Sequence, residues 1–165
     1  MTHPAALPID ELMADCRVDR TRGSGPGGQH RNKTETAIVI THVPTGLRGE
    51  ASERRSQGEN LAQAKFRLRL ELALAVRSDD ADERSHLWRS RVAGERIAVS
   101  STHDDFPAIL AEALDALAAA EWAAPLAAER LRISTSQLVK LLKQEPRGLG
   151  LLNLEQERRG MRPYR

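Results

Sequence analysis

The stretch TETAIVITHV, residues 34–43, alternates in a way that predicts a β-strand. Every second residue from Thr36 to His42 is expected on one face, and the residues between them on the other. Most of these residues are β-branched, which is typical of a strand with at least one packed face. Pro44-Thr45-Gly46 then predicts a turn, so residues 47–52 are expected to return as a hairpin partner.

The segments on either side of this hairpin predict the rest of a small α+β unit. Residues 7–13 are compatible with a short helix, and residues 17–21 with a brief strand. Ser56 is a plausible N-cap of a helix running to about residue 77, with Glu59 completing a capping box. Apolar residues recur along that helix near helical spacing. We therefore predict a small antiparallel sheet covered by one long helix.

A glycine-rich loop, RGSGPGGQH at residues 22–30, separates the first two predicted strands. Such a run costs ordering entropy and lets the backbone approach a partner closely, so we expect it to protrude. Its glycines satisfy G-x-G-x-x-G, but a dinucleotide site needs a helix directly after the motif, and a polar, basic segment follows here. Gln29 instead follows Gly27 and Gly28, whose lack of Cβ atoms clears space around its donors and acceptor.

The tripeptide Gly27-Gly28-Gln29 resembles the Gly-Gly-Gln motif of class I peptide chain release factors and ribosome-rescue peptidyl-tRNA hydrolases. The similarity spans about residues 17–77 and includes further motifs in the family's order: Asn32, KTETA at 33–37, THVPTG at 41–46, RSQ at 55–57, and Asn60. Arg31 departs from the family's usual aliphatic residue and Glu35 from its small hydroxyl residue.

The resemblance implies an enzyme that hydrolyses the peptidyl-tRNA ester in the peptidyl transferase centre of the ribosome. It implies that Gly27, Gly28 and Gln29 are catalytic, with the Gln29 N–H stabilising the oxyanion. Three further residues are expected to position the loop: Ser24, Gly25 and Pro26. Ribosomal RNA and peptidyl-tRNA are the implied partners, together with a methyltransferase that modifies Gln29; no cofactor is expected.

The net charge is only +2, but the charge is distributed unevenly. Residues 17–77 carry +6 and residues 131–165 carry +5, whereas residues 1–16 carry −3 and residues 78–130 carry −6. The two basic segments are where a polyanion such as RNA is expected to bind. The predicted phosphate contacts are Arg22, Arg31, Lys33, Arg158, Arg159, Arg162 and Arg165.

An acidic, helix-breaking stretch after Ser78 predicts a division into residues 1–78, the catalytic domain, and residues 79–165, a mainly helical module. Within the module, residues 88–100 are left open, with a short strand at 96–100 as one interpretation. We predict a helix at 106–122 and a helix-turn-helix at 127–142 with Ser134 as N-cap. Pro146 is expected to end this unit before a last short helix that begins near Leu149. The paired helices fit nucleic-acid binding and plain packing alike.

Other chemistries find little support in the composition. The five histidines are scattered and Cys16 is the one cysteine, so neither a metal site nor a disulfide is expected. Cys16 is interpreted as a small packed residue and His42 as a structural hydrogen-bonding residue. The N-terminus has no signal-peptide pattern and no apolar run reaches about 18 residues, so a cytoplasmic location is expected.

The favoured function is release of peptide from stalled ribosomes without a stop codon. Full release factors resemble this chain only over the catalytic domain, and rescue hydrolases carry a Lys/Arg-rich tail that differs from residues 147–165 here. One alternative is a catalytically inert ribosome- or nucleic-acid-binding protein that keeps the fold. A transcription regulator using the helix-turn-helix is a second, and it leaves the glycine-rich loop unexplained.

Overall fold

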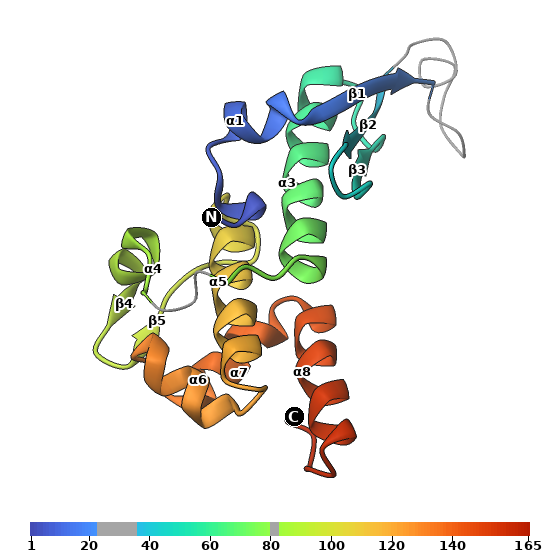
Figure 1. Cartoon of the computed structure of the whole chain (residues 1–165). Coiled ribbons are helices and arrows are strands. Elements are labelled where there is room, and N and C mark those ends of the chain that lie inside the picture. Colours follow the sequence, from blue (N-terminus) through green and yellow to red (C-terminus); the bar gives the residue numbers. More distant parts are fainter. Residues whose placement is uncertain (23–35, 80–82) are drawn as a thin grey trace. The chain divides into compact units, whose positions relative to one another are not determined.

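A computed structural model describes residues 1–22, 36–79 and 83–165 (Figure 1). It confirms the predicted α+β class. The described elements, in chain order, are η1 (Pro4–Ala6), α1 (Ile9–Ala14), β1 (Cys16–Thr21), β2 (Ala37–His42), β3 (Arg48–Ala51), α3 (Gln57–Ala75), α4 (His86–Arg91), β4 (Val92–Ala93), β5 (Arg96–Ile97), α5 (Phe106–Ala119), α6 (Ala124–Leu131), α7 (Thr135–Lys143) and α8 (Pro146–Arg158).

The chain forms two compact units, which are described separately below. The first consists of Leu7–Leu72, and the second combines Met1–Ala6 with Ala73–Arg165. That the chain divides into two independent domains at residue 78 stays a prediction.

The first unit is organised around β2, the middle strand of a sheet with the order β1-β2-β3. Both pairings are antiparallel, and the β1–β2 register runs from Cys16 opposite His42 to Thr21 opposite Ala37. Ile38 and Ile40 are buried, while Val39 between them is only half-buried. The alternation predicted from sequence is therefore confirmed.

Helix α3 packs directly on β3 through Gly49, which has no side chain (Figure 1). A Cβ atom at Gly49 would lie 2.1 Å from the Ala64 carbonyl oxygen and 2.4 Å from the Leu68 backbone nitrogen. Ala64, Leu68 and Leu72 are fully buried along the helix, as their spacing predicts. The Ser56 hydroxyl accepts a hydrogen bond from the Glu59 backbone N–H at 3.3 Å, which confirms the predicted N-cap.

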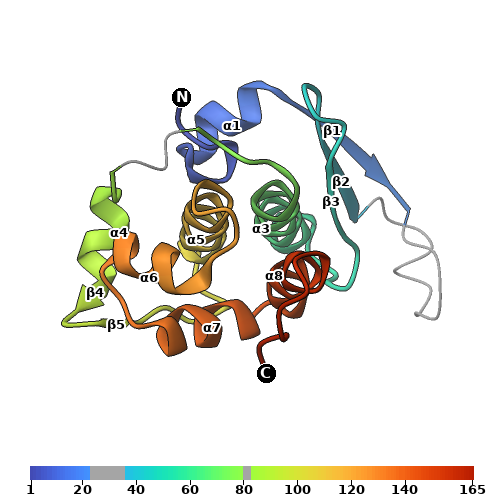
Figure 2. The ribbon, with the colours of Figure 1, turned by 60° about the horizontal axis from the view of Figure 1, so that its bottom comes forward.

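The second unit is built around α5, most of whose residues are buried. Helices α4, α6, α7 and α8 and the N-terminal η1 all contact α5, and in Figure 2 the view lies close to its axis. Trp88 on α4 is fully buried and donates its indole N–H to the Leu131 carbonyl oxygen at 2.9 Å. This bond joins α4 to the end of α6.

Helices α6 and α7, joined by a short turn, occupy the segment predicted as a helix-turn-helix. Ser134 caps α7 by accepting the Gln137 backbone N–H at 3.2 Å, as predicted. Arg132, in the turn between the helices, has a left-handed backbone with φ 57°. Leu131 and Ile133 on either side of it are buried, which fixes the turn against the core of the unit.

Two local predictions were wrong in their boundaries. Pro146 was expected to end the unit before a helix near Leu149, but it is the first residue of α8, and α7 already ends at Lys143. Proline is tolerated at the first helical position because it gives up no hydrogen bond there. Helix α5 stops at Ala119, since Glu121 and Trp122 take left-handed conformations with φ 51° and 63°. The segment from Trp88 to Ser100, left open from sequence, contains helix α4 and the short hairpin β4–β5.

Candidate functional site

The first unit presents the two ends of the glycine-rich loop side by side. Thr21 and Ala37 are paired residues at the ends of adjacent strands, so residues 22–36 connect β1 and β2 at the same end of the sheet. The predicted catalytic residues Gly27, Gly28 and Gln29 lie outside the described residues, as do the loop residues Ser24, Gly25 and Pro26 and the cations Arg31 and Lys33. Arg22 is described and is exposed at the start of the loop.

Asn60, in the first turns of α3, anchors the returning end of the loop. Its side chain is fully buried and donates to the Thr36 carbonyl oxygen at 2.7 Å and to the Arg54 carbonyl oxygen at 2.9 Å. Its side-chain oxygen also accepts the Arg54 backbone N–H at 3.0 Å. One amide therefore satisfies three backbone groups, and it ties the residue after the loop to the connection between β3 and α3.

A hollow of about 300 Å³ lies beside the same ends of β1 and β2. Its lining includes Arg22 and Arg67 together with Glu50. Arg67 donates to the Glu50 carbonyl oxygen at 2.7 Å and forms an ion pair with Glu53. Hydrogen bonding from Arg67 lowers the pKa of Glu53 to about 2. Two guanidinium groups thus line the hollow at the base of the loop, and the charge of Arg67 is already paired with that of Glu53.

His42 and Cys16 sit at the opposite end of the sheet. They are paired residues, and five strand steps of about 3.3 Å place His42 about 17 Å from Ala37. His42 is buried and its Nδ1 lies 2.8 Å from the Thr45 hydroxyl, which supports the structural interpretation. Burial and the nearby Asp15 raise the pKa of Cys16, whose thiol donates to the Leu12 carbonyl oxygen at 3.2 Å. Neither side chain can reach the loop.

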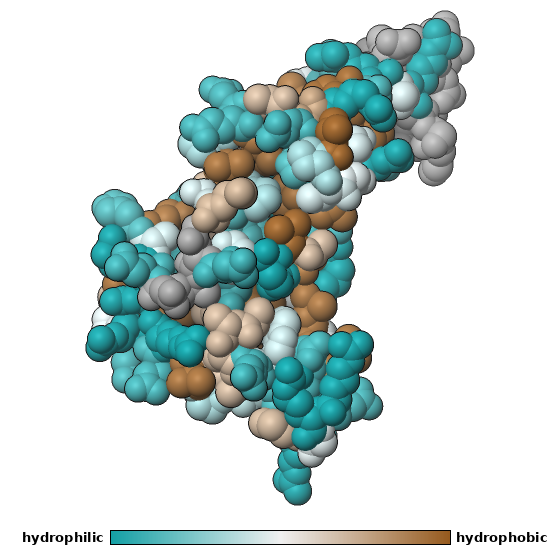
Figure 3. Space-filling view, viewed as in Figure 1, coloured by the Kyte–Doolittle hydropathy of each residue, from teal (hydrophilic) through white to brown (hydrophobic). Residues whose placement is uncertain are grey.

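The predicted contacts of the C-terminal segment belong to the second unit. Arg158 and Arg159 are exposed, but both pair with Glu155, at 2.8 Å and 2.5 Å. Arg162 and Arg165 are exposed beyond α8. Figure 3 shows the hydrophilic surface over α8 and the chain end. The Glu155 carboxylate therefore offsets part of the positive charge of these four arginines.

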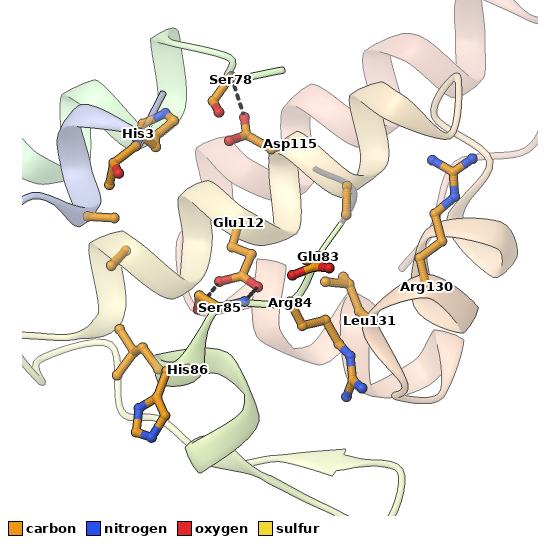
Figure 4. A pocket seen from close by; sticks show the side chains of 15 residues that line it. His3, Ser78, Glu83, Arg84, Ser85, His86, Glu112, Asp115, Arg130 and Leu131 are labelled. Carbon is orange, nitrogen blue, oxygen red and sulfur yellow. Dashed lines mark hydrogen bonds between the residues drawn. The ribbon is translucent and has the colours of Figure 1, made fainter. Parts of the chain in front are cut away.

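A larger hollow of about 410 Å³ lies in the second unit (Figure 4). Its Glu112 carboxylate accepts both the N–H and the hydroxyl of Ser85, at 2.8 Å and 2.5 Å. Asp115 accepts the Ser78 N–H at 3.1 Å and pairs with Arg77 at 3.3 Å. Burial raises the pKa of both carboxyl groups. The acids are already partnered, so they secure the fold of this unit.

His3 belongs to the same hollow and was not singled out from sequence. Its Nδ1 accepts the Ala5 backbone N–H at 3.0 Å, so its Nε2, 3.1 Å from the Val76 carbonyl oxygen, is the donor. Burial lowers the pKa of His3, in agreement with this neutral form. His3 and Val76 are too far apart in the sequence for any local pattern to predict their contact.

No group of three or more metal-ligating side chains occurs in the described part of the chain. Among the helices described, none is long and apolar enough to cross a membrane. The model of the RF-1 domain matches residues 7–104, which is more than half of the chain. The chain belongs to the RF-1 domain family.

Members of the RF-1 family act on peptidyl-tRNA at the ribosome. The match begins with the first compact unit and continues through α4 and the β4–β5 hairpin. It includes Gly27-Gly28-Gln29, and it ends before α5. The resemblance identified from the sequence is thereby confirmed at the level of the family.

Proposed function

We propose that this RF-1 protein hydrolyses peptidyl-tRNA on the ribosome and that it acts in rescue of stalled complexes without requiring a stop codon. The observation that carries the proposal is the intact Gly27-Gly28-Gln29 tripeptide between the paired ends of β1 and β2 in a chain of this family. The buried Asn60 and the cation at Arg22 support it, because they provide a fixed, positively charged base for the loop.

The proposed chemistry is the addition of water to the ester carbonyl that joins peptide and tRNA. Negative charge develops on the carbonyl oxygen, and the Gln29 backbone N–H is assigned to stabilise it. The ribose oxygen then leaves and takes a proton, which yields free peptide and deacylated tRNA. Gly27 and Gly28 supply backbone conformations that a Cβ would hinder. The ribosome provides the remainder of the site, so the isolated chain is expected to be a poor catalyst.

The test is a release assay on ribosomes that carry a labelled peptidyl-tRNA. Gly27→Ala and Gly28→Ala should each lower the release rate on the order of a hundredfold or more, the usual effect of losing an aimed oxyanion donor. Gly58→Ala is the matched control, because a Cβ there meets only the Ser56 hydroxyl at 3.7 Å. Wild-type rates in both loop variants would refute the catalytic assignment.

Codon independence is tested with three messages that place a stop codon, a sense codon or a truncated end in the decoding site. Release on the sense and truncated messages is expected to match or exceed that on the stop codon. Activity confined to the stop codon would refute the rescue assignment. Ribosome binding without release on any message would favour the alternative, an inert protein that keeps the fold.

Two finer parts of the proposal have separate measurements. Methylation of Gln29 predicts a mass increase of about 14 Da on the loop peptide, the mass of one CH₂ group, in protein purified from its own cell. A role for the C-terminal arginines predicts weaker ribosome binding when Arg158, Arg159, Arg162 and Arg165 are replaced by glutamine, and unchanged binding would exclude it.

A further inference from the structure

The exposed face of α7 is a basic surface that the proposed chemistry does not use. Helices α5, α6 and α8 and strand β5 all contact α7, and they bury Leu138, Val139, Leu141 and Leu142. The side that remains open carries Ser136, Lys140, Lys143 and Gln144, all exposed. The helix therefore presents to solvent a face with no apolar side chain.

The structure shows no ion pair for the cations of this face in the described part of the chain. Lys140 and Lys143 lie at positions i and i+3, which brings their Cβ atoms to about 5–6 Å. No ion pair involves either lysine, or Arg132 before the helix, within the ranges 1–22, 36–79 and 83–165. The acid nearest to the two lysines in the sequence, Glu145, pairs with Arg147 at 2.7 Å.

Arg132 occupies a position whose geometry favours another residue. Its φ of 57° is one that glycine adopts without a steric penalty and that arginine adopts rarely. The turn therefore does not need arginine for its conformation, and the exposed side chain contributes a positive charge at the N-terminal end of the lysine face. We name the set Arg132, Lys140 and Lys143 the α7 face.

The chemistry of the α7 face fits phosphate better than a protein partner or a base-reading site. Protein interfaces depend on apolar and aromatic anchors, and the exposed residues of α7 include none. Base reading by a helix-turn-helix uses side chains near the start of its second helix. Here the Ser134 hydroxyl caps α7, and the Gln137 side chain accepts the Ile97 N–H at 3.4 Å, so both are engaged internally.

We propose that the α7 face binds the phosphate backbone of structured RNA, as a contact separate from the glycine-rich loop. That the bound RNA is ribosomal rests on the proposed function, whereas the affinity of the α7 face for RNA phosphates does not. Three released counterions correspond to a salt slope of roughly 2–3 in log K against log [salt]. The contact positions the protein and reads no sequence.

The test uses the full-length protein with three probes: ribosomes, a 20-base-pair RNA duplex, and a DNA duplex of the same sequence. The triple variant Arg132→Gly, Lys140→Gln, Lys143→Gln should lower the salt slope by roughly 2–3 and weaken RNA binding about tenfold or more at low salt. Its urea midpoint should stay unchanged, because glycine suits φ 57° and both lysines are exposed. Arg89→Gln on α4 is the control, since Arg89 is also exposed and lies outside the α7 face.

Each outcome decides one of the two proposals. An unchanged slope and affinity in the triple variant overturn the α7 assignment, even if the protein releases peptide. Loss of duplex binding in a protein that never releases peptide supports the α7 face and refutes the hydrolase. Equal binding to RNA and DNA duplexes without binding to ribosomes overturns the ribosomal source. Release by the triple variant should fall at limiting protein and recover at saturating protein, which Gly28→Ala should not do.

Discussion

The Asn60 amide connects helix α3 directly to the returning end of the loop. Asn60→Asp keeps the size of the side chain but replaces the donor nitrogen by an acceptor oxygen. The carbonyl oxygens of Thr36 and Arg54 then lose their donor at 2.7 Å and 2.9 Å, while the Arg54 N–H keeps its acceptor. Each buried polar group left unpaired costs about 1–3 kcal/mol, so the expected loss of stability is about 2–6 kcal/mol.

Urea unfolding followed by circular dichroism measures this loss. With a slope of about 1–3 kcal/mol per M, a loss of 4 kcal/mol moves the midpoint by roughly 2 M. Peptide release on ribosomes is expected to fall as well, at temperatures where the variant is still folded, because Thr36 no longer fixes the returning end of the loop. Ribosome binding should change less than the release rate.

Asn153→Asp is the matched control for the chemistry of the substitution. Asn153 makes a similar pair of bonds, to the carbonyl oxygen and the N–H of Tyr164 at 2.9 Å and 2.7 Å, but it is half-buried near the chain end. Its replacement should cost under about 1.5 kcal/mol, the ordinary net worth of a hydrogen bond. A midpoint for Asn60→Asp within about 0.3 M of wild type, close to the uncertainty of the method, would refute the anchoring argument.

Three further predictions concern the packing and charge of the two units. Gly49→Ala should cost about 3 kcal/mol or more, because its Cβ would collide with the backbone of α3 at 2.1 Å; a melting temperature near wild type would contradict this. Glu53→Gln should cost at most about 1 kcal/mol at pH 7, since Glu53 and Arg67 are partly exposed. The pKa of Glu53, about 2, is depressed in the folded state, so its contribution is present above about pH 4.3 and disappears as the pH falls toward 2. The urea midpoints of wild type and Glu53→Gln should therefore converge on acidification, and a constant gap would exclude the Arg67 pairing as its cause. Trp88→Phe should cost about 1–3 kcal/mol by leaving the Leu131 carbonyl oxygen unpaired, and a calorimetric melt with no shift would contradict that bond.

Sequence patterns predicted the parts of this fold that depend on neighbours in the chain. The alternation from Thr36 to His42 gave the central strand and its buried face, and Ser56 and Ser134 act as the N-caps their positions predict. These are local effects, in which a side chain contacts backbone within a few residues. The family could be identified from sequence for the same reason, because its motifs are short local stretches in a fixed order.

Contacts between distant residues were beyond such patterns. Asn60 meets Thr36 across 24 positions, and His3 meets Val76 across 73. Nothing about Gly49 in the sequence indicates that a helix backbone lies against it. Helix α4 was missed because its six residues are too short to show a period, and it is held by the burial of Trp88. The predicted catalytic residues lie outside the described residues, so their roles rest on the family and on the experiments above.

The pairing of Thr21 with Ala37 has a consequence for loop engineering. Both ends of the intervening segment are fixed by adjacent strands. The entropy of closing such a segment grows only with the logarithm of its length, so doubling the length adds only about 0.6 kcal/mol. The sheet and α3 should therefore accept a foreign loop between residues 22 and 36 if the acceptor for Asn60 at residue 36 is kept. A chain with an unrelated loop there should keep its unfolding midpoint, so the chemistry of this protein can be exchanged while its scaffold stays constant.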